Sequence, residues 1–324
     1  MFKKYTNATS LNVYLNAADA LGLHHEILDA RTHYALITDG KKTVLLKKTS
    51  PSWNGLAQFH FSRDKYATSQ LLSKKGLPVP EGRLFTRDES EDVLEYAKKL
   101  VPVVIKRNSG AAGNNVFVKL EKVDEINHAV SEIVTHTKGN ILVESYHEGT
   151  DYRALVFDGH VCDVIERIPA YVVGDGERDI ETLIKLKNEE RISSGIKSSL
   201  LKLDSMTRAT LKKSGYELGS IVENGEKVAI RGGCNFSSGG EVNKIALEDI
   251  HPDNLELFIA AQQTIGLMQA GVDFISSDIS VSYKENGAVI NEVNGTIGVD
   301  IHYRADNKST AAIESVLKYY FELS

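Results

Sequence analysis

The chain has 324 residues, of which 42% are hydrophobic and 25% charged, a composition typical of globular proteins. Its formal net charge of −6 argues against a general nucleic-acid or anionic-membrane surface, although a local basic cleft remains compatible with it. No stretch approaches the roughly twenty apolar residues of a membrane helix, and MFKKYTNATS lacks the apolar run of a secretory signal. Cys162 and Cys234 lie far apart and in no metal-binding spacing, so we expect a reducing, cytoplasmic environment.

Small α/β elements open the chain. A helix is predicted over residues 10–23, followed by strands at 33–39 and 42–48 with a turn at Asp39-Gly40. A capped helix follows within residues 61–80, with Ser62 as its N-cap and Gly76 and Pro78 ending it. A further helix over residues 90–100 leads into the strand PVVIK, residues 102–106.

The pattern then becomes antiparallel. PVVIK and NVFVKL flank the loop SGAAGNN, ILVESY is another strand, and Asp158-Gly159 joins RALVF to HVCDVI as a hairpin. The helix expected at residues 251–271 has Pro252 at its start and Gly271 at its end. The last helix, residues 309–324, carries one apolar stripe: Ile313, Val316, Leu317, Tyr320 and Phe321. Helices mixed with antiparallel hairpins predict an α+β architecture in more than one lobe.

Two neighbouring segments near the C-terminus combine apolar alternation with acidic and amide side chains. DISVSY, residues 278–283, and GAVINEVN, residues 287–294, flank a turn at KENG. With a three-residue loop, Asp278 would face Asn294 and share one face with Glu292, an oxygen-rich set that suits Mg²⁺. A two-residue turn would shift the pairing and make Asp273 the better third ligand. A half-exposed edge hairpin with solvated acids is the alternative interpretation.

A lysine stands at the root of the small-residue loop. Lys106 immediately precedes NSGAAGNN, where small residues let backbone N–H groups approach phosphate oxygens closely. The alternative interpretation of these residues is a hairpin loop with an incidental lysine. The chain contains no G-x-x-x-x-G-K-[ST] motif, and GDGERD lacks the last glycine of a dinucleotide fingerprint, so any ATP is held without a P-loop.

Taken in order, the motifs resemble the ATP-grasp superfamily, in particular the ATP-grasp portions of cyanophycin synthetase and of bifunctional glutathione synthetase. The likeness covers residues 62–304 through DKYATSQLLSKKGLPVPEG, VVIKRNSGAAGNNVFV, LVESYHEGTDYRALVFDG, VIERIPAYVVGDGERDIETLI, RGGCNFSSGGEV, GVDFISSDIS and INEVNGTIGVDIHY. It implies an ATP-grasp fold with two α+β lobes gripping ATP. Residues 1–61 would form a small N-terminal α/β domain, 62–147 the lid lobe, and 148–324 the C-terminal lobe with the metal and substrate site.

The resemblance also implies roles for single residues. The phosphates of ATP would meet Lys65, Lys106 and the loop glycines Gly110 and Gly113. Adenosine would be held by Glu144 at the adenine amino group, by backbone around Tyr146 and His147, and by Asp151 at the ribose. Anion clamps and catalytic contacts would come from Arg153, Arg167, Arg231 and Asn235. Glu292 and Asn294 would be two metal ligands, and the hairpin argument above makes Asp278 the third. Asn115 stands where relatives carry glycine, so closure of the loop over ATP would be less tight. NGTIGVD also lacks a proline that family members commonly have.

The family reaction activates a carboxylate with the γ-phosphate of ATP, and an amine then attacks the acyl phosphate to give an amide. The resemblance therefore implies a ligase for a small amino acid or peptide, using ATP and Mg²⁺, with two ions and with Mn²⁺ as a substitute. Its partners would be the carboxylate and amine substrates, without nucleic acid or membrane, and a homodimer is the expectation for such ligases. An ATP-dependent phosphotransferase and a non-catalytic ATP-sensing protein are the alternatives.

Overall fold

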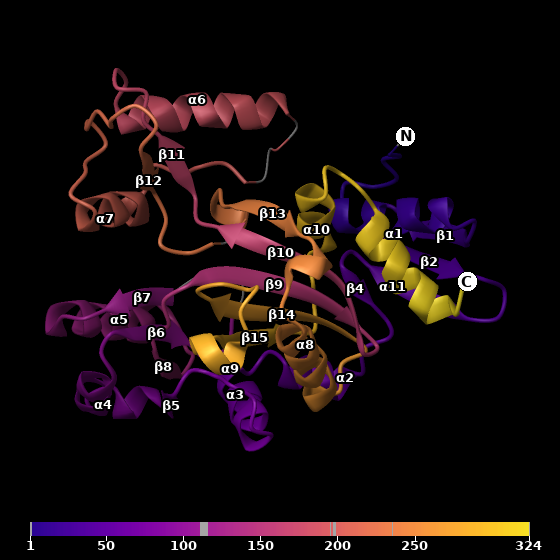
Figure 1. Ribbon diagram of the computed structural model, residues 1–324, viewed down its shortest axis with the longest axis horizontal. Helices are drawn as coiled ribbons and strands as arrows, with labels where there is room; N and C mark the ends of the chain where they lie inside the picture. Colours follow the sequence, from indigo (N-terminus) through magenta and orange to yellow (C-terminus); the bar gives the residue numbers. More distant parts are fainter. Residues whose placement is uncertain (1, 111–115, 195, 197–198, 235, 324) are drawn as a thin grey trace.

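The computed structural model describes residues 2–110, 116–194, 196, 199–234 and 236–323. Its described helices and strands form an α+β fold with antiparallel sheets, as the sequence predicted. Figure 1 shows a central sheet with one lobe above it, a second below it, and the N-terminal segment at the opposite end beside the C-terminus.

The N-terminal segment, residues 2–61, is a helix packed on a small antiparallel sheet of order β1-β2-β3-β4. Its elements are α1 (Thr9–Ala20), β1 (His24–Asp29), β2 (Tyr34–Thr38), β3 (Thr43–Lys47), β4 (Ser50–Pro51) and α2 (Leu56–Phe61). Strands β2 and β3 alternate buried and exposed residues, so one face is apolar. That face belongs to a core that also contains Leu155, Phe157 and residues of the C-terminal helices. The segment therefore folds against the rest of the chain.

The second lobe, residues 62–145, packs two helices on a four-stranded antiparallel sheet of order β5-β8-β6-β7. Its elements are α3 (Lys65–Lys74), β5 (Gly82–Phe85), α4 (Asp92–Leu100), β6 (Val103–Arg107), β7 (Val116–Leu120), α5 (Val123–His136) and β8 (Ile141–Ser145). Helices α4 and α5 bury Val93, Ala97, Ile126, Ala129 and Ile133 at helical spacing against this sheet. The lobe thus has a core of its own.

The central sheet has the order β13-β10-β9-β14-β15, and every described pairing in it is antiparallel. Its elements are β9 (Thr150–Phe157), β10 (His160–Ile168), β13 (Glu241–Ile245), β14 (Gln269–Ser276) and β15 (Val289–Asn294). The predicted hairpin at Asp158-Gly159 is confirmed, with φ angles of 44° and 76°. Helix α8 (Pro252–Ile265) covers the face that carries Tyr152, Ala154, Val272 and Phe274.

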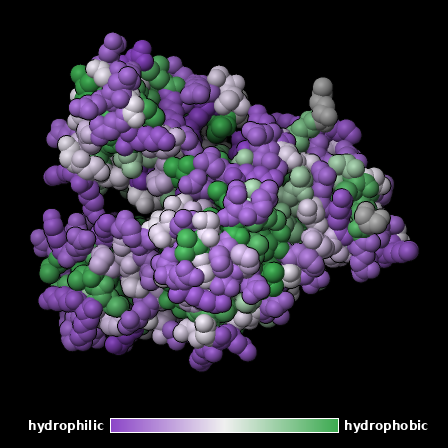
Figure 2. Space-filling model, in the orientation of Figure 1, coloured by the Kyte–Doolittle hydropathy of each residue, from purple (hydrophilic) through white to green (hydrophobic). Residues whose placement is uncertain are grey.

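Residues 170–230 form a separate lobe, the α6–α7 lobe, that the sequence did not predict. Its elements are β11 (Tyr171–Val173), α6 (Ile180–Ser193), α7 (Ser205–Lys213) and β12 (Lys227–Ala229). A small core including Val172, Ile184, Leu211 and Val228 holds them together. The lobe lies above the central sheet in Figure 1, and Figure 2 shows the surface hollowed between it and the second lobe.

The C-terminal part is helical. It comprises α9 (Tyr283–Asn286), α10 (Val299–Ala305) and α11 (Ala311–Phe321). Elsewhere in the chain, 3₁₀ turns occur at Arg87–Glu89, Phe236–Ser238 and Leu247–Asp249. The predicted stripe on α11 is confirmed for Ile313, Val316, Leu317 and Phe321, which are buried. In the described residues, every helix is too short or too polar to span a bilayer.

Two predicted boundaries are wrong. The N-cap of α3 is Asp64, whose carboxylate accepts from the Ala67 N–H at 2.9 Å, and not Ser62. Helix α8 ends at Gly266, a left-handed C-cap with φ 74°, five residues before Gly271. Gly271 lies instead within β14.

Candidate functional site

Four adjacent strands of the central sheet carry charged side chains opposite one another. On β10 and β9, Arg167 pairs with Asp151; on β9 and β14, Arg153 pairs with Asp273; on β14 and β15, Asp273 pairs with Glu292. Residues two apart on a strand share a face, so these side chains project from the same side of the sheet. The opposite side is the apolar face covered by α8. The strand order therefore brings together residues that lie 106 and 120 positions apart in sequence.

Asp273 is the centre of this cluster. Its carboxylate, 4% exposed, accepts from Nε and Nη2 of Arg153 at 2.6 and 2.7 Å and from Nη2 of Arg167 at 2.9 Å. Arg167 also donates to Asp151, at 2.8 Å from Nε and 2.6 Å from Nη2. Burial by itself would raise the pKa of Asp273, but the two guanidinium groups outweigh it and hold that pKa below its ordinary value. Asp273 is therefore a carboxylate at neutral pH.

Lys65 joins this cluster from the first turn of α3. Its Nζ lies 2.7 Å from Oε1 of Glu292 and donates to the Gly110 carbonyl at 3.3 Å. Asn294, two residues after Glu292, lies with its amide nitrogen 3.5 Å from Oδ2 of Asp273. Lys65 thus bridges the metal strand predicted from the sequence and the start of the small-residue loop.

The start of α3 is fixed to the strand that leads into that loop. Asp64, its N-cap, accepts from the side-chain amide of Asn108 at 2.9 Å, and Asn108 in turn accepts from the Tyr66 N–H at 2.9 Å. Asn108 lies two residues beyond Lys106. These hydrogen bonds therefore link the start of the helix that carries Lys65 to the end of the strand that carries Lys106. The N-capping geometry therefore sets where Lys65 points.

Lys106 and Glu144 form a buried ion pair on neighbouring strands β6 and β8. The Nζ–Oε2 distance is 2.5 Å, and the two side chains are 5% and 4% exposed. Beyond β8, the half-buried ring of Tyr146 has the Lys119 ammonium 5.4 Å from its centroid. His147 lies 3.1 Å from the Ser145 hydroxyl, and burial lowers the pKa of its imidazole, so the ring is neutral at pH 7. These residues lie where the second lobe joins the central sheet.

Arg231 is engaged elsewhere. Its guanidinium donates to both carboxylate oxygens of Asp204 at 2.8 and 2.7 Å, and Asp204 is the N-cap of α7. This half-buried contact ties the segment after β12 to the α6–α7 lobe, and sequence reasoning gave no signal for Asp204. Gly113 and Asn235 lie outside the described residues.

The hairpin argument for Asp278 is wrong. Residues 278–282 form no strand, and β15 pairs with β14, so Asn294 faces Gly271 and Glu292 faces Asp273. Asp278 is exposed and accepts from the N–H and hydroxyl of Ser280 at 2.8 and 2.7 Å. The alternative residue, Asp273, is the carboxylate beside Glu292.

The oxygen donors at this place fit a hard divalent cation. Asp273, Glu292 and Asn294 offer carboxylate and amide oxygens on adjacent strands, the ligand type that Mg²⁺ prefers. Within the described ranges, no three His, Cys, Asp or Glu side chains are grouped closely enough to hold a metal by themselves. Mg²⁺ commonly takes one or two carboxylates and completes its shell with water and phosphate, so this donor set suits a cation that arrives with phosphate.

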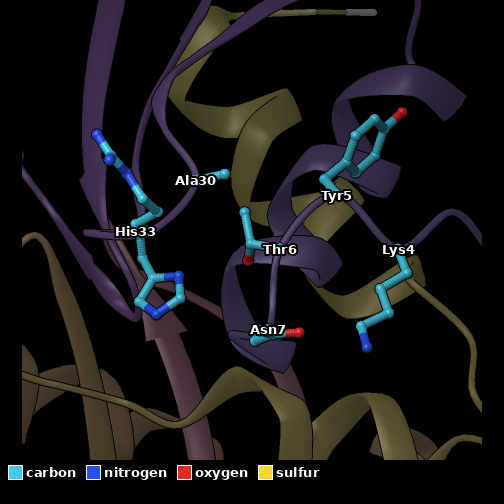
Figure 3. A pocket seen from close by; sticks show the side chains of 7 residues that line it. Lys4, Tyr5, Thr6, Asn7, Ala30 and His33 are labelled. Carbon is cyan, nitrogen blue, oxygen red and sulfur yellow. The ribbon is translucent and has the colours of Figure 1, made fainter.

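A pocket in the N-terminal segment lies apart from this cluster. It is lined by residues 4–7 and by residues 30, 31 and 33, and Figure 3 shows Lys4 and His33 on opposite sides of it. None of its lining residues was predicted to take part in the site.

Comparison with known proteins agrees with the resemblance. Residues 62–172 match the RimK-like ATP-grasp domain family. Over 303 residues the chain is 34% identical to cyanophycin synthetase of Synechocystis sp., covering 90% of this chain and 34% of that protein. It is 28% identical to the glutathione biosynthesis bifunctional protein GshAB of Clostridium perfringens over 309 residues, covering 93% and 39%. The chain thus spans between a third and two fifths of the length of these relatives.

Two solved structures share the fold. A bifunctional glutathione synthetase from Pasteurella multocida superposes with a TM-score of 0.67 at 24% identity, covering 97% of this chain and 44% of that one. D-alanine–D-alanine ligase from Bacillus anthracis gives 0.51 at 15% identity, covering 84% and 72%. The predicted ATP-grasp fold is confirmed.

Proposed function

We propose, from the premise that this chain has the ATP-grasp fold and carries a RimK-like ATP-grasp domain at residues 62–172, that it is an ATP- and Mg²⁺-dependent carboxylate–amine ligase. The observation that carries the proposal is the contact between Lys65 and the group of oxygen donors on β14 and β15. Lys65 contacts Glu292 directly, while Asp273 and Asn294 lie on the adjoining positions of β14 and β15. Lysine ammonium groups neutralise phosphate charge, and carboxylate and amide oxygens coordinate a divalent cation.

In the proposed reaction the γ-phosphoryl group passes to a substrate carboxylate, and an amine then displaces phosphate to form an amide, ADP and phosphate. Lys106 and Lys65 would neutralise phosphate charge, and Arg153 or Arg167 would bind an oxyanion through a planar guanidinium. Bound Mg²⁺, held by Asp273, Glu292 and Asn294, would polarise the phosphate oxygens. Each of these lysine and arginine side chains has a carboxylate partner in the structure. Binding of ATP would exchange that carboxylate for a phosphate and leave few charges unpaired.

The nucleoside would be recognised at the junction between the second lobe and the central sheet. We assign the adenine amino group to Glu144, the ring to backbone at Tyr146 and His147, and the ribose to Asp151. The neutral imidazole of His147 supports this assignment because it adds no charge next to an uncharged base. The loop glycines Gly110 and Gly113 would cover the phosphates.

The acceptor side is assigned to Arg231, which contacts the α6–α7 lobe, and to Asn235. An acyl phosphate hydrolyses readily, so water must be kept away while the amine attacks. The hollow between this lobe and the second lobe in Figure 2 supports a role for both lobes as covers. We keep the division into residues 1–61, 62–147 and 148–324 as the proposed domain layout.

The relatives' names, which refer to cyanophycin, glutathione and D-alanyl-D-alanine synthesis, support a substrate class. We therefore propose an amino acid or short peptide as each substrate. We also propose that the protein binds two Mg²⁺ ions, that Mn²⁺ can replace them, and that the protein is a cytoplasmic homodimer. Mass photometry and ADP release with Mn²⁺ in place of Mg²⁺ test the homodimer and the Mn²⁺ replacement.

The deciding experiment is incubation with ATP, Mg²⁺ and pools of amino acids and dipeptides, with ADP and product followed by mass spectrometry. Amine-dependent ADP release with an amide product supports the ligase. A phosphorylated product without an amide would replace the proposal with phosphotransfer, and tight ATP binding without turnover on any pool would favour the sensing alternative.

A further inference from the structure

The turn that follows Asn294 is held by the N-terminal segment and by Ser62, the first residue after that segment. The Gly295 carbonyl accepts from the side chain of Asn54 at 2.9 Å, and the Gly295 N–H donates to the Ser62 hydroxyl at 3.2 Å. Two residues later, the Ile297 carbonyl accepts from the hydroxyl of Thr49. Residues that are distant in sequence therefore fix the end of the strand that carries Glu292 and Asn294.

Asn54 stands out because its side-chain amide is fully used. Its Nδ2 donates to the carbonyls of Gln269 and Gly295 at 2.8 and 2.9 Å, and its Oδ1 accepts from the N–H groups of Met268 and Gln269 at 2.9 Å each. An amide nitrogen has two hydrogens to donate and its oxygen has two lone pairs. All four are occupied, so the side chain is held in one orientation.

These four bonds join the beginning of β14 to the end of β15. Gln269 is the first residue of β14, and Gly295 directly follows the last residue of β15, so the amide bridges the pair as one more peptide group would. Asp273 lies four residues from one anchor, and Asn294 lies next to the other. Register between the two strands decides whether their oxygens converge.

The anchor itself is well supported. The Gln269 side-chain oxygen accepts from Nε1 of Trp53 at 2.9 Å and from the hydroxyl of Tyr14 at 3.0 Å, and Tyr14 is fully buried. The residue before Asn54 is thus tied to the same point of β14. A bridge supported in this way can hold a strand end against thermal motion.

We propose that Asn54 is a positioning residue for the divalent-cation site, fixing the end of β15 so that Asn294 and Glu292 stay aligned with Asp273. The inference rests on the proposed function for the identity of the bound group. It gives residues 1–61 a part in the site beyond the ATP-grasp motifs.

The first test is independent of ligands. Hydrogen exchange followed by mass spectrometry should show residues 294–298 exchanging at least tenfold faster in Asn54→Ala and in Asn54→Asp than in the native chain. The aspartate keeps the two acceptor contacts but cannot donate to the Gly295 carbonyl. Asn16→Ala is the matched control, since Asn16 is equally half-buried and makes three hydrogen bonds within the same segment. Unchanged exchange in both Asn54 variants overturns the inference.

The second test uses calorimetry with ATP, with and without Mg²⁺. In the native chain Mg²⁺ should increase ATP affinity by a certain factor, and in Asn54→Asp that factor should be at least tenfold smaller. ATP affinity without metal should be the same in both. Asn16→Ala should keep the whole gain. If the native chain and the Asn54 variants show the same gain, the positioning role is wrong and the proposed function survives. If the native chain shows no gain, the proposed function and this inference both fail.

Discussion

Replacing Asp273 with asparagine should reduce stability strongly, because it removes the only carboxylate that contacts both Arg153 and Arg167 among the described residues. The two guanidinium groups are 16% and 9% exposed at their side chains, and Asp273 is 4% exposed. Breaking a buried ion pair by removing one partner typically costs about 3–5 kcal/mol, since the remaining charge is left uncompensated. Arg167 keeps Asp151, which places the expected loss toward the lower end. Exposed Asp278 provides the matched control, and Asp278→Asn should leave unfolding unchanged.

The assay is urea unfolding followed by circular dichroism and by the fluorescence of Trp53, the single tryptophan. The pKa of Asp273 is held below its ordinary value of 3.8, so its contribution is fully present above that pH and is lost as the pH falls through the folded-state pKa. The difference between native chain and Asp273→Asn should therefore be full at pH 7 and at pH 5 and shrink below about pH 3.8. A difference under about 1 kcal/mol at pH 7 would refute the picture of a buried carboxylate neutralising two arginines.

Three further predictions concern the site. Glu292→Gln should remove most Mg²⁺-dependent ADP release while circular dichroism stays native; full turnover would contradict the metal assignment. Lys106→Ala should raise the calorimetric Kd for ATP at least tenfold and also destabilise the fold by leaving Glu144 unpaired, whereas adding Glu144→Gln should restore stability without restoring ATP affinity. Recovery of both, or of neither, would argue against separate roles. Burial of the thiols raises the pKa of Cys162 and Cys234 to about 12, although both residues are half-buried, so the native protein should react slowly with a thiol-specific disulfide reagent at pH 8, and labelling within minutes would contradict the raised pKa.

Local signals predicted those elements whose geometry is decided by neighbouring residues. Asp158-Gly159 marks a two-residue hairpin because both residues adopt positive φ, which few residue types tolerate. The stripe on α11 is visible because one face of that helix is buried and the other is exposed. In both cases the sequence contains the cause of the structure.

Residues 278–283 misled the sequence reasoning because their alternation is not that of a strand. Asp278 binds the N–H and hydroxyl of Ser280, and Ser282 caps the short helix α9, so polar side chains compete with strand pairing. The true partner strand, β14, is buried on both faces along most of its length and shows no alternation. Periodicity alone therefore favoured the wrong segment.

Long-range partners were beyond the reach of sequence reasoning. Arg153 and Arg167 were proposed as anion clamps from the sequence. Their shared partner, Asp273, lies 120 and 106 positions away, and its place beside them depends on strand order. The α6–α7 lobe escaped notice because its core is assembled from a few residues of each short element, such as Ile180 and Ile184 of α6. No single element there carries a long apolar pattern.

The charges of the cluster cancel before any ligand is present. Three acids and three bases contribute: Asp151, Asp273 and Glu292 against Arg153, Arg167 and Lys65. Burial raises the pKa of Asp151, and it is counted as ionised because Arg167 donates two hydrogen bonds to it. A bare triphosphate entering such an electroneutral patch would add several uncompensated negative charges at a place where water is scarce, which is costly. Nucleotide and divalent cation are therefore expected to enter together, as a complex with a smaller negative charge than the free nucleotide, and ATP affinity should depend on ionic strength less than it would at a strongly basic surface.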